Sequence, residues 1–258
     1  MRPLRGSFRR GVNRYAGLLD SRGAGRYSTC MSVRASVSCA AVGFVAPCLP
    51  SLADRPPKGA GWIHEIKHDG FRMMVRRNGV GVRLFTRNGY DWTNRYPLIR
   101  QAAHALRAGS FLLDGEAVNC NEDGFPDFNT LRHRRNDRTV FLYAFDLMEL
   151  DGRDLRREAI ETRKTELAKL LRKADYGIFL NEHVEDEAAI VFQHACKLGL
   201  EGIVSKRRGS PYVSGRSSHW RFSSPRCFDT RDSAVTCSRL DRTNGWRGCA
   251  ASPSRARK

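Results

Sequence analysis

The nine residues from His64 to Arg72 read HEIKHDGFR, and they fit two unrelated enzyme signatures. The first five letters fit H-E-x-x-H, in which two histidines bind one zinc ion. The last six fit K-x-D-G-x-R, in which the lysine acts as a nucleophile. The two signatures require different backbones, because His64 and His68 can bind the same ion only if a helix stacks them one turn apart. The conformation of this stretch therefore decides the fold around it.

The stretch favours a strand over a helix. Glycines on both sides limit it to residues 62–69, which is short for a helix, and apolar and polar side chains alternate along it. In a strand that rises about 3.3 Å per residue, His64 and His68 stand about 13 Å apart and cannot bind one ion. We therefore assign no role to these histidines. Glu65 and Lys67 share one face of the strand, and a turn at residues 69–70 follows directly.

The composition is that of a globular protein with an uneven distribution of charge. The 258 residues are 41% hydrophobic with a mean hydropathy of −0.50, and no run approaches the ~18 apolar residues of a membrane span. The net charge is +18. Residues 1–61 contribute +8 and residues 223–258 contribute +5, which leaves +5 for residues 62–222. The basic flanks make the total charge a weak indication of nucleic-acid binding.

The sequence suggests one folded domain between two atypical flanks. Residues 1–55 are expected to be disordered or extended; residues 1–30 read either as a transit peptide or, preferably, as sequence upstream of a start at Met31. Residues 56–222 are expected to form the domain, and residues 223–258 a disordered tail. The eight cysteines form no C-x-x-C pair, which argues against a zinc ribbon or a disulfide framework and favours a reducing, cytoplasmic setting.

Periodicity within the domain predicts strands joined by tight turns, with helices between them. Segments 71–77 and 80–86 flank Asn78-Gly79, a strong hairpin signal. Further strands are expected at 110–118, 140–150 and 202–206. Helices are expected at 96–106, 163–171 and 185–198, the last ended by Gly199. This pattern predicts an α+β domain of largely antiparallel sheets flanked by helices.

Five short elements then occur in a recognisable order. They are EIKHDGFR (65–72), LFTRNG (84–89), LLDGE (112–116), LYAFD (142–146) and LEGIVSK (200–206). Together they resemble the adenylation domain of ATP-dependent DNA ligases, within the covalent nucleotidyltransferase superfamily. The short bacterial and ligase-D-like branch is the most similar. The resemblance implies a nucleotidyltransferase (ATP-grasp-like) fold and a bacterial, cytoplasmic enzyme.

The resemblance also implies a reaction and a set of residues. Lys67 would attack the α-phosphorus of ATP, and the AMP would then pass to the 5′-phosphate of nicked double-stranded DNA, with other DNA-repair proteins as possible partners. Glu116 and Glu201 would hold Mg²⁺, which prefers carboxylate oxygens. Phe145 would pack on adenine. The residues implied to bind the nucleotide are Glu65, Arg72, Arg87, Glu116, Phe145, Lys206 and Arg216. On the residues alone, Glu116 and Glu201 could be exposed strand-end acids, and Phe145 could be plain core.

The sequence departs from the family pattern after Trp220. The family's last motif reads W-x-K-x-K and its lysines contact the α-phosphate, but here Phe222 and Ser224 occupy the two lysine positions. We hypothesise that residues 221–258 are an out-of-frame translation. The OB-fold domain that normally follows in the family is also not recognisable. Two alternatives therefore stay open: a non-catalytic remnant that binds nucleotide or DNA ends, and an RNA ligase or capping-type nucleotidyltransferase.

Overall fold

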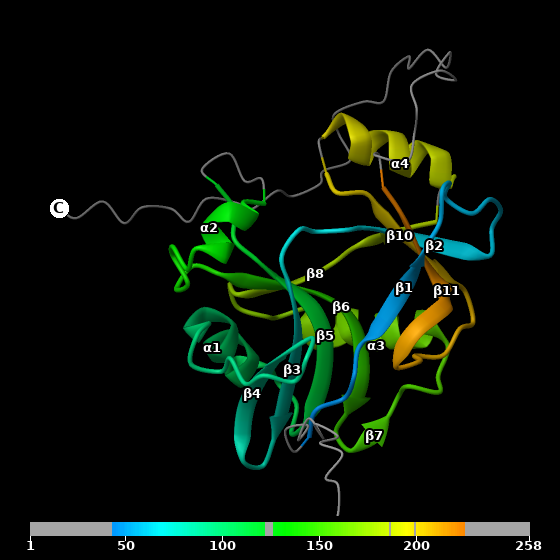
Figure 1. The fold of residues 1–258 in the computed structure, drawn as a ribbon. Coiled ribbons are helices and arrows are strands. Elements are labelled where there is room, and N and C mark those ends of the chain that lie inside the picture. Colours follow the sequence, from blue (N-terminus) through cyan, green and yellow to red (C-terminus); the bar gives the residue numbers. More distant parts are fainter. Residues whose placement is uncertain (1–42, 122–125, 186, 199, 225–258) are drawn as a thin grey trace, which may run out of the picture. The chain divides into compact units, whose positions relative to one another are not determined.

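The computed structural model describes residues 43–121, 126–185, 187–198 and 200–224 (Figure 1). Its stretch around Lys67 is a strand followed by a loop, as predicted: β2 spans Trp62–Ile66. Nδ1 of His64 lies 2.8 Å from Oγ of Ser205, whereas Nε2 of His68 lies 3.0 Å from Oδ1 of Asn181. The two histidines therefore have separate partners, and the helical arrangement that a zinc site requires is not formed.

Two sheets build the domain. The five-stranded sheet has the order β1-β11-β10-β2-β9, and the six-stranded sheet has the order β4-β3-β5-β6-β7, with β8 paired to β6. The α+β class is confirmed, and the sheets are largely antiparallel as predicted; among the described strands, β1 pairs with β11 and β8 with β6 in parallel. The remaining strands are β1 (Cys48–Leu52), β3 (Phe71–Asn78), β4 (Gly81–Thr86), β5 (Phe111–Val118), β6 (Phe141–Leu150), β7 (Arg153–Asp154), β8 (Ile178–Leu180), β9 (His183–Val184), β10 (Ile203–Arg207) and β11 (Gly215–Ser223).

The predicted hairpin is present, but its turn lies one residue later than expected. Asn78 pairs with Gly81, so Gly79 and Val80 form the two-residue loop. The side chain of Asn78 accepts a hydrogen bond from the backbone N–H of Val80 at 3.0 Å. Asn78 thus stabilises the turn from the position before the loop. The Asn-Gly pair in the sequence does not show whether the asparagine lies within the loop or just before it.

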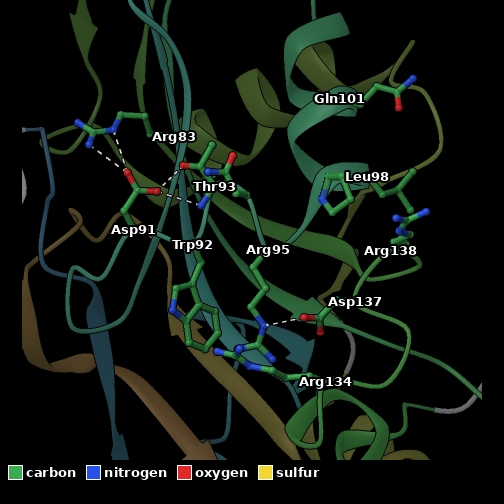
Figure 2. A pocket seen from close by; sticks show the side chains of 12 residues that line it. Arg83, Asp91, Trp92, Thr93, Arg95, Leu98, Gln101, Arg134, Asp137 and Arg138 are labelled. Atoms are coloured by element: carbon green, nitrogen blue, oxygen red, sulfur yellow. Dashed lines mark hydrogen bonds and ion pairs between the residues drawn. The ribbon is translucent and has the colours of Figure 1, made fainter.

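Four helices are described, and the predicted ones begin or end within about three residues of their expected limits. They are α1 (Pro97–Ala105), α2 (Phe128–Arg132), α3 (Ile160–Leu171) and α4 (Ala188–Lys197). α4 packs on β10 and β2, whereas α1 and α3 cover the six-stranded sheet (Figure 1). The start of α1 borders an open cleft (Figure 2). Gly199, expected to end α4, lies outside the described residues.

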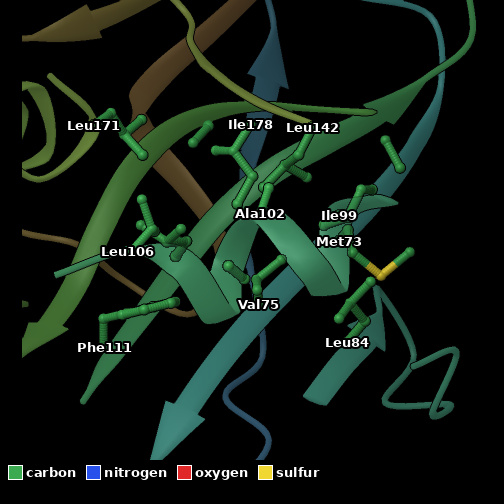
Figure 3. Close-up of a cluster of buried hydrophobic side chains, with 14 of the residues drawn as sticks. Met73, Val75, Leu84, Ile99, Ala102, Leu106, Phe111, Leu142, Leu171 and Ile178 are labelled. Carbon is green, nitrogen blue, oxygen red and sulfur yellow. The ribbon is translucent and has the colours of Figure 1, made fainter. Parts of the chain in front are cut away.

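The largest buried cluster lies between the six-stranded sheet and α1 and α3 (Figure 3). Period-2 patterning directs Met73 and Val75 of β3 to this side, where they meet Ile99 and Ala102 of α1. A second cluster joins the two sheets to each other and includes Met74, Phe85, Phe145, Tyr212 and Trp220. The alternation of buried residues along β3 thus separates a helix-covered face from a face that looks toward the other sheet.

The folded domain begins upstream of residue 56, the predicted start. β1 pairs with β11 from Cys48↔Gly215 to Leu52↔Phe222, and Cys48 is fully buried. A five-residue strand whose partner lies over 160 residues away gives too short a periodic signal to recognise. At the other end, β11 continues through Ser223, so the strand extends past the predicted change at Phe222. The tail from residue 225 and the flank before residue 43 lie outside the described residues.

Candidate functional site

Lys67 follows the last residue of β2, where its backbone is fixed and the tip of its side chain is accessible. Its N–H donates to the carbonyl of Gly202 at 3.0 Å. Its Nζ contacts the carboxylate of Glu201 in an ion pair, and the Lys67 side chain is 29% exposed. The ring centroid of Phe222, on β11, lies 5.3 Å from Nζ. Three segments that are distant in sequence therefore meet at this amine.

Glu116 supplies a second carboxylate near Lys67. It stands opposite Arg72 in the ladder between β5 and β3. Burial raises the pKa of Glu116 to about 7, although the positive charges of Arg72 and Lys67 oppose the shift. Within the described part of the chain, its side chain makes no hydrogen bond or ion pair. Lys67 is thus accompanied by one carboxylate in an ion pair and by another that has no partner among the described residues.

Arg72 lies beside this group but already has partners. Its guanidinium binds both oxygens of Asp114, at 2.6 and 2.7 Å, and donates to the carbonyl of Cys48 at 2.9 Å. Burial disfavours its charge, yet Asp114 holds the pKa of Arg72 above its ordinary value. The guanidinium also lies 4.5 Å from the ring centroid of Phe145. In this arrangement Arg72 connects the two sheets, and its expected contact with phosphate remains a prediction.

Glu65, two residues before Lys67, is buried in a network of charges. Its oxygens lie 2.9 Å from Nζ of Lys164 and 2.8 Å from Nζ of Lys206. Burial opposes its ionisation, but the two lysines hold the pKa of Glu65 below its ordinary value. Lys206 is 1% exposed, and its Nζ lies 4.7 Å from the Phe145 ring centroid. Three of the expected nucleotide-binding residues, Glu65, Phe145 and Lys206, are therefore neighbours, but all three are buried.

Two expected site residues lie apart from this group. Arg87 is exposed in the turn after β4, and Arg216 is exposed on β11, where it donates to the carbonyl of Pro50 at 3.4 Å. Across the described residues, neither arginine has a hydrogen bond or ion pair that joins it to Lys67 or its carboxylates. Their contacts with nucleotide or DNA stay predictions.

Asn181 is a residue of the site that the sequence did not reveal. It follows β8 and is 4% exposed. Its Nδ2 donates to the carbonyl of Ile66 at 3.2 Å, and its Oδ1 lies 3.0 Å from Nε2 of His68. Burial lowers the pKa of His68 to about 4, so the ring is neutral and its N–H can donate to this oxygen. Asn181 thus binds the residue on each side of Lys67.

His68 is further held by an aromatic contact. Its ring stacks on Tyr143 of β6, with centroids 3.9 Å apart and planes 8° from parallel. The loop that carries Lys67 is therefore attached to the six-stranded sheet as well as to β10. No signal in the sequence identifies Asn181, because one asparagine after a three-residue strand has no motif around it.

The described residues hold no cluster of three or more histidine, cysteine, aspartate or glutamate side chains suited to a metal ion. Glu116 and Glu201 beside Lys67 are instead two carboxylates, the number that Mg²⁺ commonly takes from a protein while waters and phosphates supply its other ligands. No helix within the described ranges is long and apolar enough to cross a membrane.

Comparison with known sequences identifies the domain. Residues 50–221 match the family described as "ATP dependent DNA ligase domain". The multifunctional non-homologous end joining protein LigD of Pseudomonas aeruginosa is 40% identical over 181 residues, which are 69% of this chain and 21% of that protein. The SPbeta prophage-derived DNA ligase-like protein LigB of Bacillus subtilis is 28% identical and matches over 69% of this chain and 66% of that protein. The chain thus spans about a fifth of the length of the LigD proteins it matches.

Comparison with solved structures agrees. The ligase domain of Mycobacterium tuberculosis LigD superposes with a TM-score of 0.63 at 34% identity, covering 69% of this chain and 60% of that one. The mycobacterial DNA ligase D complexed with ATP and MES gives a TM-score of 0.62 at 32% identity, covering 70% and 60%. With the family match over residues 50–221, these similarities show that the chain belongs to the ATP-dependent DNA ligase family, as an adenylation domain of the ligase-D-like branch.

Proposed function

We propose that this chain carries out the first step of DNA ligation, in which Lys67 becomes covalently linked to AMP. The observation that supports it is the position of the Lys67 amine, which is accessible and contacts Glu201, with Glu116 nearby. The neutral amine forms a bond to the α-phosphorus of ATP, the bond from that phosphorus to pyrophosphate breaks, and pyrophosphate leaves with the electron pair. The amine loses its proton, and the Glu201 carboxylate is in contact to accept it.

The residues around Lys67 would position the nucleotide and its charge. Arg72 is close enough to influence the charge of Glu116, and it would add positive charge next to the phosphates. Glu65 and Lys206 are buried behind the nucleophile and would act by holding β2 and β10 in register, since Lys206 also pairs with Ile63 across the ladder. Arg87 and Arg216, which are exposed, would act on the sugar or on DNA.

The carboxylates fit a magnesium ion. Glu116 has no hydrogen-bond or ion-pair partner among the described residues, and burial raises its pKa to about 7, so a cation bound beside it would favour its charged form. Glu116 and Glu201 would therefore hold Mg²⁺, which prefers carboxylate oxygens over the histidines of the same strand. When bound, the ion would neutralise charge on the phosphates as pyrophosphate leaves.

The later steps would take place on DNA. The AMP on Lys67 passes to the 5′-phosphate at a nick, and the 3′-hydroxyl then displaces it and seals the strand. The relatives named for non-homologous end joining suggest that the substrate is nicked or broken double-stranded DNA in a bacterial cytoplasm, together with other repair proteins. An RNA ligase or a capping-type enzyme shares the first step and differs in nucleotide and acceptor.

A second candidate function is that of a domain that binds nucleotide or DNA ends without catalysis. It is favoured by Phe222, which lies near the Lys67 amine at a position where the family carries a lysine. The two functions differ in whether a covalent product forms.

Incubation of the full chain with α-labelled ATP and Mg²⁺ tests the proposal. We expect label to remain on the denatured protein, to be released by acid rather than alkali as a phosphoramidate is, and to be lost when Mg²⁺ is removed. Labelled GTP should give no product. Nicked DNA, but not nicked RNA, should release the AMP. A well-folded protein that binds ATP and takes up no label would contradict the proposal and support the second candidate.

Asn181→Leu should slow the formation of lysine–AMP by between about 10-fold and 10²-fold, because the loop on both sides of Lys67 loses its hydrogen bonds. The KM for ATP should change less than the rate, since the nucleotide contacts are retained. Asn119→Leu is the matched control: Asn119 is also buried (5% exposed) but bonds to Thr139. If Asn119→Leu slows the step as much as Asn181→Leu, the effect is a general loss of stability.

A further inference from the structure

A cleft of about 1060 Å³ opens beside the start of α1 (Figure 2), and its lining includes neither Lys67 nor the carboxylates of Glu116 and Glu201. Its walls come from β4 and the segment after it, from α1, and from the loop between α2 and β6. Four arginines and two aspartates line it: Arg83, Asp91, Arg95, Arg134, Asp137 and Arg138. None of these residues carries a role in the reaction described above.

Two of the four arginines are already neutralised. Arg83 lies 3.0 Å from the carboxylate of Asp91, and Arg95 lies 3.2 Å from that of Asp137. Arg134 and Arg138 are exposed, and among the described residues neither has a hydrogen bond or ion pair from its side chain. The cleft therefore carries two positive charges that pair with no carboxylate of the described residues.

The loop that supplies these charges is strongly basic. Residues 132–138 read RHRRNDR, which places four arginines within seven positions. Its single acid, Asp137, is engaged by Arg95. Every one of the four arginines is exposed. Like charges this close repel one another, so a bound polyanion would stabilise the loop as it stands.

Arg95 attaches the loop to the opposite wall of the cleft. Arg134 and Asn136 adopt left-handed backbone angles, with φ of 56° and 62°, a region that residues other than glycine rarely occupy. Arg95 lies on the opposite wall. Its guanidinium donates to the carbonyl of Leu131 at 3.2 Å, and it stacks 4.1 Å from the ring centroid of Trp92 (Figure 2). Arg95 thus contacts the chain on both sides of Arg134, at Leu131 and at Asp137.

The cleft is within reach of a duplex held at Lys67. Phe71 begins β3 four residues after Lys67, a span of at most about 14 Å. The Phe71 ring lies 5.3 Å from Trp92, which lines the cleft. DNA carries a phosphate about every 3.4 Å along each strand, so a path of about 20 Å passes several phosphates of each strand.

We propose that Arg134 and Arg138 bind backbone phosphates of double-stranded DNA on one side of the nick. The guanidinium groups would recognise the DNA by the charge and spacing of its phosphates, because their paired N–H groups match phosphate oxygens. Contacts of this kind carry no preference for particular bases. The inference rests on the proposed function for the presence of DNA, but it concerns a surface that the adenylation of Lys67 does not use.

The test compares Arg134→Gln/Arg138→Gln with Arg153→Gln/Arg157→Gln in the full chain. The control pair is exposed near β7, at the opposite edge of the six-stranded sheet, and removes the same charge. Binding of a fluorescent nicked duplex is measured from 50 to 200 mM salt. For the cleft variant we expect affinity to fall at least about tenfold at low salt, and the slope of log K against log salt to decrease by about 2. The basic flanks contribute equally to both proteins.

Uptake of labelled AMP from ATP tests the adenylation of Lys67 separately from DNA binding at the cleft, because adenylation needs no DNA. We expect the cleft variant to take up AMP at the wild-type rate. Equal affinity and equal salt slope in the cleft and control variants would overturn the proposal, whatever the label shows. Wild-type protein that binds DNA through the cleft yet takes up no AMP would support the cleft and contradict adenylation.

Discussion

Replacement of Lys67 with alanine is expected to abolish the covalent label from ATP, a loss on the order of 10³-fold or more. The reason is that the two described lysines around Glu65 cannot replace the Lys67 amine. Lys164 and Lys206 are 3% and 1% exposed and are held in ion pairs with the Glu65 carboxylate. Lys67→Arg should be equally inactive, because a guanidinium stays protonated and cannot attack phosphorus.

The measurement is the amount of radioactive AMP that remains on the denatured full chain after incubation with Mg²⁺. Lys58→Ala is the matched control, since Lys58 is exposed in the loop before β2. Its label should equal that of the wild type. Label that persists in Lys67→Ala would show that another residue is the nucleophile. Circular dichroism of each variant establishes that the fold is retained.

Phe222→Lys is expected to increase the rate of lysine–AMP formation by about 10²-fold. The Phe222 ring lies 5.3 Å from the Lys67 amine, so the side chain at position 222 points to where the reacting phosphate would lie. An ammonium group there would stabilise the negative charge that develops during the displacement. Adding or removing one such group in an active site typically changes a rate by about 10²–10³-fold.

The initial rate of label uptake, measured before ATP is depleted, tests this expectation. Phe222→Met is the control because it removes the aromatic ring without adding charge, and it should leave the rate within a few-fold of wild type. A Phe222→Lys protein that folds and labels no faster than Phe222→Met would mean that position 222 does not face the phosphates.

The sequence predicted the elements of the fold that have a local signal. The strand at β2, the hairpin and three helices follow from periodicity and turn residues, and the order of five short motifs indicated the nucleotidyltransferase fold. The sequence also placed Glu116 and Glu201 in one site with Lys67, on resemblance alone. The structure brings these three side chains near one another from three strand ends or loops that are separated by 49 and 85 residues.

The side-chain contacts that could not be predicted from the sequence are made with partners that are distant along the chain. Arg72 carries the expected motif, but nothing local shows that Asp114 binds it. Glu65 and Lys206 were predicted to bind the nucleotide. In the structure they form a buried network of ion pairs with Lys164 of α3. The hydrogen bonds of Asn181 span 113 and 115 residues. Such contacts exist only after the two sheets have packed, and a motif cannot encode them.

The parallel pairing of β1 with β11 determines where this domain can be shortened. β11 lies between β1 and β10, and the N–H of Ala53 donates to the carbonyl of Phe222 at 2.9 Å. A protein that begins at residue 56 would leave the backbone of β11 unpaired along one side. Exposed strand edges of this kind recruit other chains and lead to aggregation. The part of the chain to retain for expression, crystallisation or labelling therefore begins before Cys48, well upstream of the first motif that identifies the family.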